Sequence, residues 1–76
     1  MRETYDGRDP RKYVRLADKL RREIEDGTLA AREPIPAISR LAQEHQMSPA
    51  TARRAMHALL AEDLIRYVPG HGYYVS

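Results

Sequence analysis

The sequence of 76 residues contains no cysteine, which excludes disulfide bonds and thiolate metal sites. It contains no apolar run close to the roughly 18 residues that a membrane-spanning helix requires. Its polar, charged N-terminal segment lacks the pattern of a secretory signal, and neither an internal repeat nor a low-complexity segment is present. So short a chain folds as one domain at most and buries only about 60% of its unfolded surface, which leaves little room for a deep catalytic cavity.

Hydrophobic residues make up 42% of the chain and charged residues 32%, a balance typical of a folded globular domain. The formal net charge is only +2, so the composition permits a nucleic-acid partner without requiring one. Basic residues are frequent before residue 16 and recur between residues 40 and 66, whereas acidic residues are frequent between residues 18 and 26. A folded chain could therefore gather its basic side chains on one face.

The first predicted helix covers residues 11–26, because apolar residues recur there at the spacing of one helix face. Residues 1–10 lack this period and contain the turn signals Asp6-Gly7 and Asp9-Pro10, so we expect a flexible arm. Gly27 suits the left-handed conformation that ends many helices. The apolar stripe of this helix consists of Tyr13, Leu16, Ala17, Leu20 and Ile24.

A connector is predicted at residues 28–36, where Pro34 and Pro36 prevent a regular helix. Ile35 between them should be extended and should pin the connector onto the core. A short helix is predicted at residues 37–45.

The third predicted helix covers residues 49–63 and follows a tight connection at residues 46–48. Ser48 is a strong N-cap candidate, and Pro49 suits the first helical position. The apolar stripe of this helix consists of Ala52, Ala55, Met56, Leu59 and Leu60.

The C-terminal segment, residues 64–76, predicts a β-hairpin whose turn is Pro69-Gly70-His71-Gly72. Tyr73 and Tyr74 alternate in direction, so one is expected in the core and the other on the surface. The predicted fold is mostly α, with three helices and a small β-hairpin. Two helices joined by a short turn form a DNA-binding motif, and a hairpin directly after them is a wing. We therefore expect an N-terminal arm (1–10) and a winged helix-turn-helix domain (11–76).

Three stretches in this order carry a family resemblance: YVRLADKLRREIEDGTL, IPAISRLAQEHQMSPATARRAMHALLAEDLI and YVPGHGYYV. Together the run from Tyr13 to Val75 resembles the N-terminal DNA-binding domain of the GntR family of bacterial regulators. The resemblance implies that the third helix enters the major groove of double-stranded DNA. It also implies that the wing approaches the minor groove or the backbone.

Two positions depart from the family pattern. Family members often have arginine where this chain has Ser39 and again where it has Pro49, so we expect a different operator sequence. Arg40 lies beside Ser39 and is retained as a candidate, although a shift of one residue turns a side chain by about 100° around a helix. Family members also usually continue into a larger effector-binding and dimerising domain. We expect no effector site within this chain.

The candidate DNA contacts lie on the predicted recognition helix, the helix before it and the wing. Arginine reads guanine O6 and N7 or clamps phosphate, and helix-opening residues reach base edges or phosphates. The alternative interpretations are a solvated helix face for the arginines, a simple cap for Ser48 and an exposed turn for the wing. The candidates are Arg40, Ser48, Ala50, Thr51, Arg53, Arg54, His57, Gly70, His71 and Gly72.

Metal binding and catalysis are not supported by the pattern. His45, His57 and His71 fall on three different predicted elements without a close ligand pair. The serines lack the context of a nucleophile, and the carboxylates are spread along solvated faces. We therefore expect neither an enzyme nor a cofactor.

The sequence favours a cytoplasmic, nucleoid-associated bacterial regulator of transcription, a repressor by family resemblance. Its partner would be double-stranded DNA rather than a membrane, and a homodimer would be weak or would form on DNA. Two alternatives remain: a winged-helix module for protein–protein contact, and an architectural DNA-binding factor of the excisionase kind. An interaction module should present apolar or acidic residues on the outer face of the third helix, whereas this chain is expected to present Thr51, Arg53, Arg54 and His57 there.

Overall fold

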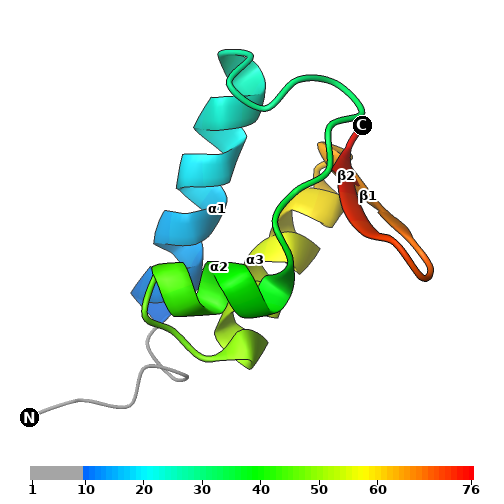
Figure 1. The fold of residues 1–76 in the computed structure, drawn as a ribbon. Helices are drawn as coiled ribbons and strands as arrows, with labels where there is room; N and C mark the ends of the chain where they lie inside the picture. Colours follow the sequence, from blue (N-terminus) through cyan, green and yellow to red (C-terminus); the bar gives the residue numbers. More distant parts are fainter. Residues whose placement is uncertain (1–9) are drawn as a thin grey trace, which may run out of the picture.

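Three helices pack together, and a two-stranded hairpin lies beside the third of them in the computed structural model, which describes residues 10–76 (Figure 1). This arrangement confirms the predicted winged helix-turn-helix. The predicted arm lies outside the described residues except for Pro10, which is the first residue of α1. The elements are α1 (Pro10–Glu25), α2 (Ile38–Glu44), α3 (Pro49–Ala61), β1 (Ile65–Val68) and β2 (Gly72–Val75).

The core lies where α1, α2 and the hairpin meet α3. The apolar stripe of α3 faces inward as predicted, and Ala52, Ala55, Met56 and Leu59 are fully buried. The other elements and the connector contribute further apolar side chains to this core, and α3 packs against α1, α2 and β1. These residues are Leu16, Ala17, Leu20, Ile35, Leu41, Ala42, Ile65 and Val75.

Helix α3 ends two residues earlier than predicted, and the cause is a local backbone motif. Asp63 has a φ of +60°, a left-handed conformation that cannot continue the helix. The N–H of Asp63 donates to the carbonyl of Leu60 (3.0 Å), and the N–H of Leu64 donates to that of Leu59 (3.1 Å). These two bonds form a Schellman motif, which satisfies the last carbonyls of the helix.

The turn between α2 and α3 uses the same device. Gln46 has a φ of +55°, and the N–H of Met47 donates to the carbonyl of Ala42 at 2.9 Å. Met47 is half-buried and packs against the core. Gly27 after α1 is also left-handed, with a φ of +87°, which confirms the predicted helix end.

The connector pairs with β2, so the wing belongs to a small sheet. Ile35 is buried, and its N–H donates to the carbonyl of Tyr73 at 2.9 Å, while the N–H of Val75 donates to Glu33 at 2.9 Å. Pro34 forms an isolated antiparallel bridge with Tyr74. The expectation that Ile35 pins the connector onto the core is confirmed.

The hairpin pairs β1 with β2 in a register that places Val68 opposite Gly72. Gly70 (φ +83°) follows Pro69, and the N–H of His71 donates to the carbonyl of Val68 at 2.9 Å, which is the geometry of a type II turn. The tyrosine pair alternates as predicted, because Tyr73 packs against the core whereas Tyr74 faces the outer side of the sheet. Both side chains are half-buried.

Candidate nucleic-acid interface

The N-terminus of α3 is fixed by a side-chain cap. The Ser48 Oγ accepts a hydrogen bond from the backbone N–H of Thr51 at 3.1 Å, and Pro49 occupies the first turn, so the predicted cap is confirmed. Ser48 is half-buried, whereas Ala50 is exposed at the start of the helix. Ala50 is therefore a small apolar group that this end of α3 presents to solvent, beside the exposed Pro49.

Thr51 is placed differently from the other candidates. It is only 3% exposed, and its Oγ1 is hydrogen-bonded to the Ser48 Oγ at 2.9 Å. Its side chain therefore supports the start of α3 from inside, which corrects the expectation that it lies on the outer face of the helix.

The two arginines of α3 are both exposed but point in different directions. Arg53 lies on the side of the wing, where it lines a hollow of about 350 Å³. Arg54 lies on the side of α1, with its guanidinium carbon 4.4 Å from the centre of the Tyr13 ring. Successive residues on a helix diverge by about 100°, so adjacent arginines reach opposite flanks of α3.

The hollow beside Arg53 lies between α3, the start of α2 and the wing. Its wing side is lined by His71, together with Tyr67 and Tyr73. These two rings pack with their centres 5.1 Å apart, and Tyr67 remains 54% exposed. Tyr67 was not selected from the sequence. It stands two residues after the buried Ile65, and residues two apart in a strand lie on the same face, so this spacing indicated the core-side face of β1.

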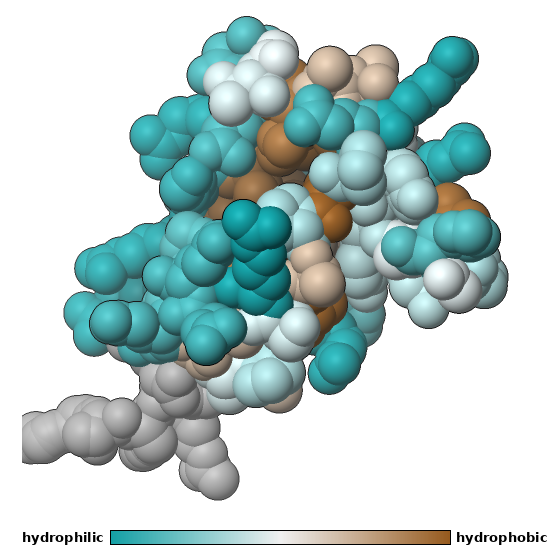
Figure 2. All heavy atoms as spheres, in the orientation of Figure 1, coloured by the Kyte–Doolittle hydropathy of each residue, from teal (hydrophilic) through white to brown (hydrophobic). Residues whose placement is uncertain are grey.

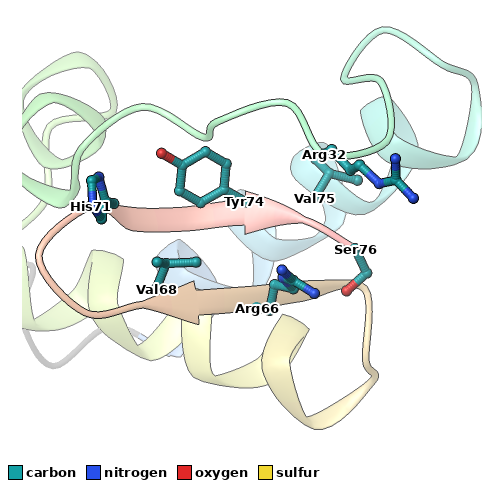
Figure 3. A pocket seen from close by; sticks show the side chains of 7 residues that line it. All are labelled: Arg32, Arg66, Val68, His71, Tyr74, Val75 and Ser76. Carbon is teal, nitrogen blue, oxygen red and sulfur yellow. The ribbon is translucent and has the colours of Figure 1, made fainter.

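The outer face of the wing carries a second hollow, of about 520 Å³ (Figure 3). His71 lies at the turn end of this face, and Arg32 and Arg66 lie at the opposite end, with Tyr74 between them (Figure 3). Arg32 was not a sequence candidate, because only the pairing of the connector with β2 brings it to the wing.

The remaining candidates are separated from this group. Arg40 is 69% exposed, but its Nε donates to Glu44 at 2.9 Å within α2, so its charge is partly compensated. His57 is exposed on α3, and Gly70 is exposed at the turn. Within residues 10–76, no three histidine or acidic side chains lie close enough to hold a metal ion. None of the helices in that part of the chain is long and apolar enough to cross a membrane.

Two acidic side chains form a cluster with Arg21 at the other end of α3, which is about 20 Å long. Arg21 of α1 donates to Glu62 through its Nε (2.8 Å) and Nη2 (2.5 Å), and its Nη1 donates to Asp18 (2.5 Å). These bonds hold the pKa of Glu62 below its usual value and raise the pKa of Arg21.

Hydrophilic side chains cover α1 and α2, with a strip of hydrophobic surface beside the connector (Figure 2).

A capped helix after a tight turn, two diverging arginines and a basic wing beside them define a winged helix-turn-helix domain. The sequence of residues 12–75 matches the family described as bacterial regulatory proteins of the gntR family. The chain belongs to this family.

Curated relatives support the same assignment. The chain is 32% identical over 64 residues to the mannosyl-D-glycerate transport/metabolism system repressor MngR of Escherichia coli. It is 34% identical over 64 residues to the transcriptional regulator GmuR of Bacillus subtilis. Each alignment covers 84% of this chain and 27% of the relative, so the chain spans about a quarter of the length of these proteins.

Solved structures with the same fold include a protein bound to DNA. The DNA-binding domain of AraR in complex with an operator superimposes with a TM-score of 0.82 and 28% identity, covering 86% of this chain and 78% of that one. A GntR-family regulator from Listeria monocytogenes gives a TM-score of 0.82 with 28% identity, covering 95% of this chain and 62% of that one.

Proposed function

We propose that this chain binds double-stranded DNA with sequence preference and acts as a transcriptional repressor. α3 would enter the major groove, and the wing (64–76) would lie at the minor groove or the backbone. The observation that carries the proposal is the position of Arg53, exposed on α3 and facing His71 and Tyr67 of the wing across one hollow.

This geometry suits a groove edge. A guanidinium can donate two parallel hydrogen bonds to guanine O6 and N7, or it can clamp a phosphate. A duplex strand that passes between α3 and the wing would bring a phosphate toward the hollow, where the hydroxyl of Tyr67 and the imidazole of His71 can donate to it. Ala50 at the start of α3 could meet a thymine methyl group.

Two sequence candidates have indirect roles in this proposal. The Ser48 cap and the buried Thr51 fix where α3 begins. They would therefore fix how far along the groove edge the side chain of Arg53 lies. Arg40 on α2 and His57 on α3 are proposed as contacts to the backbone, which carry affinity rather than base specificity. Gly70 and Gly72 allow the turn that brings His71 to the tip of the wing.

The test compares two arginine variants. A duplex would be selected from a random pool with the unmodified chain, and its affinity measured at several salt concentrations beside a scrambled duplex. Arg53→Ala should lose about 1–3 kcal/mol on the selected duplex if Arg53 reads a base. Arg22→Ala is the matched control, because Arg22 is also an exposed helix arginine but lies in the last turn of α1.

The outcomes separate the proposal from its rivals. Equal affinity of Arg53→Ala and the unmodified chain for both duplexes would overturn the docking geometry. Tight binding with no preference between the duplexes would favour an architectural factor. A failure to select any duplex would favour a protein-interaction module, although the basic outer face of α3 is unlike such an interface.

We further propose that two copies bind two half-sites about one helical turn apart and associate weakly without DNA. One small module buries only about 600–1,000 Å² on DNA, so a second copy would supply the missing affinity. Sedimentation without DNA, and with one or two half-sites, tests this, and a stable dimer without DNA would contradict it. The proposed setting is the bacterial cytoplasm at the nucleoid, with no small-molecule effector bound within the chain.

A further inference from the structure

Arg54 rests on an aromatic ring rather than on a carboxylate. Its guanidinium carbon lies 4.4 Å from the centre of the Tyr13 ring. Arg21 and Arg40, by contrast, are bonded to acidic side chains. Within residues 10–76, the Tyr13 ring is the contact that the structure gives for the Arg54 guanidinium. The positive charge of Arg54 is therefore oriented by a ring, and no acidic side chain within residues 10–76 forms an ion pair with it.

Tyr13 is a firm support for this side chain. It is half-buried and packs against the core, so its ring has little freedom to move with Arg54. The first turn of α1 is also attached to the turn of the helix-turn-helix, because the Lys12 Nζ donates to the carbonyl of Gln46 at 2.7 Å. Both contacts join α1 to the helix-turn-helix, because Lys12 bonds to the turn before α3 and Tyr13 contacts α3 itself.

A guanidinium can stack and donate at the same time. The π face of the ring attracts its charge, while all its N–H groups point outward in the plane of the guanidinium and remain free for a phosphate. An arginine held in one orientation also loses less conformational freedom when it binds than one that is free in solvent.

We propose that Tyr13 is a positioning residue for DNA binding: it holds Arg54 in the orientation that contacts a backbone phosphate on the α1 side of α3. This inference rests on the proposed function, and it extends the interface to an element outside the helix-turn-helix and the wing. Arg53 and Arg54 then contact different parts of the duplex. Arg53 contacts it on the wing side, and Arg54 contacts the backbone of the strand that passes beside the first turn of α1.

The test is a double-mutant cycle on the full chain, with affinity for the selected duplex measured across a salt series. Tyr13→Phe keeps the ring and should bind like the unmodified chain. Tyr13→Leu keeps apolar packing without a π face and should weaken binding about two- to fivefold, with the salt dependence unchanged because no charge is lost. Arg54→Gln should weaken binding and reduce the salt slope by about one.

The decisive comparison is the Tyr13→Leu/Arg54→Gln double variant. If Tyr13 acts through Arg54, the double variant binds no more weakly than Arg54→Gln alone. If Tyr13 only stabilises the fold, Tyr13→Leu costs the same in both backgrounds, which overturns the inference. Unchanged binding by Arg54→Gln also overturns it while leaving the proposed function intact. If the unmodified chain shows no preference for any duplex, both this inference and the proposed function are overturned.

A measurement without DNA covers the case in which Tyr13→Leu does not fold. Ring currents should shift the NMR signals of the Arg54 side-chain protons upfield in the unmodified chain and equally in Tyr13→Phe. Arg54 δ-protons at random-coil positions in both proteins would contradict the stacked orientation and overturn the inference.

Discussion

Replacement of Ser48 by alanine should destabilise the domain more than the loss of an ordinary helix cap. The cap itself contributes about 1 kcal/mol. The substitution also leaves the hydroxyl of Thr51 without the partner that it has at 2.9 Å. Because Thr51 is 3% exposed, water cannot easily replace that partner, and an unpaired buried hydroxyl costs about 1–3 kcal/mol. The expected total loss is therefore about 2–4 kcal/mol.

The same argument predicts that a second substitution repairs part of the damage. Thr51→Val alone should cost about 1 kcal/mol, since the half-buried Ser48 can turn to solvent. In Ser48→Ala/Thr51→Val no hydroxyl is left unpaired, so the double variant should be more stable than Ser48→Ala. Thermal melts by circular dichroism resolve this, because 1 kcal/mol shifts Tm by about 4–8 °C in a domain of this size. A double variant whose loss equals the sum of the two single losses would refute the reasoning.

Three further predictions concern α3 and its end. Leu59→Ala should cost about 2–5 kcal/mol in chemical denaturation, because Leu59 is fully buried; a loss below 1 kcal/mol would mean that the core collapses around the gap. Asp63→Gly should raise Tm slightly, because the left-handed φ of +60° costs a residue with a Cβ more than glycine; a lower Tm would show that the carboxylate itself stabilises the turn. The bonds from Arg21 lower the pKa of Glu62 below its ordinary value of 4.5. The contribution of this pair to stability is therefore fully present above pH 4.5 and is lost as the pH falls through the lower pKa that Glu62 has in the folded state. Glu62→Gln should therefore melt below the unmodified chain at pH 7, and the difference should shrink as the pH falls below the folded-state pKa of Glu62; a difference that stays constant with pH would contradict this assignment.

Local sequence patterns were sufficient for the elements of the fold. The 3.6-residue period predicted the helices, the Ser48-Pro49 pair predicted the start of α3, and the Pro69-Gly70 turn predicted the wing. Helix ends were less accurate because Gln46 and Asp63 adopt left-handed conformations that neither residue type announces. These turns form because burial of the following residues stabilises them.

The site was harder to predict because several of its contacts join distant parts of the chain. Thr51 was expected on the outer face, yet it stands one helical turn before the buried Ala55, and this spacing alone indicated the inner face. The family resemblance favoured the opposite interpretation. No local pattern could bring Tyr13 beneath Arg54 or Arg32 beside the wing, because each pair is separated by more than thirty residues of chain.

Pairing of the connector with β2 has a consequence for the order in which the domain can form. Its hydrogen bonds join Arg32 and Ile35 to Val75 and Tyr73, so they close a loop that contains the whole helix-turn-helix. Contacts between such distant residues form late and slow the folding of a small domain. During synthesis α2 and α3 leave the ribosome before the strand that fixes the connector exists. The helices of the DNA-reading unit can form early, but the wing and the recognition helix reach their mutual positions only when the end of β2 has emerged.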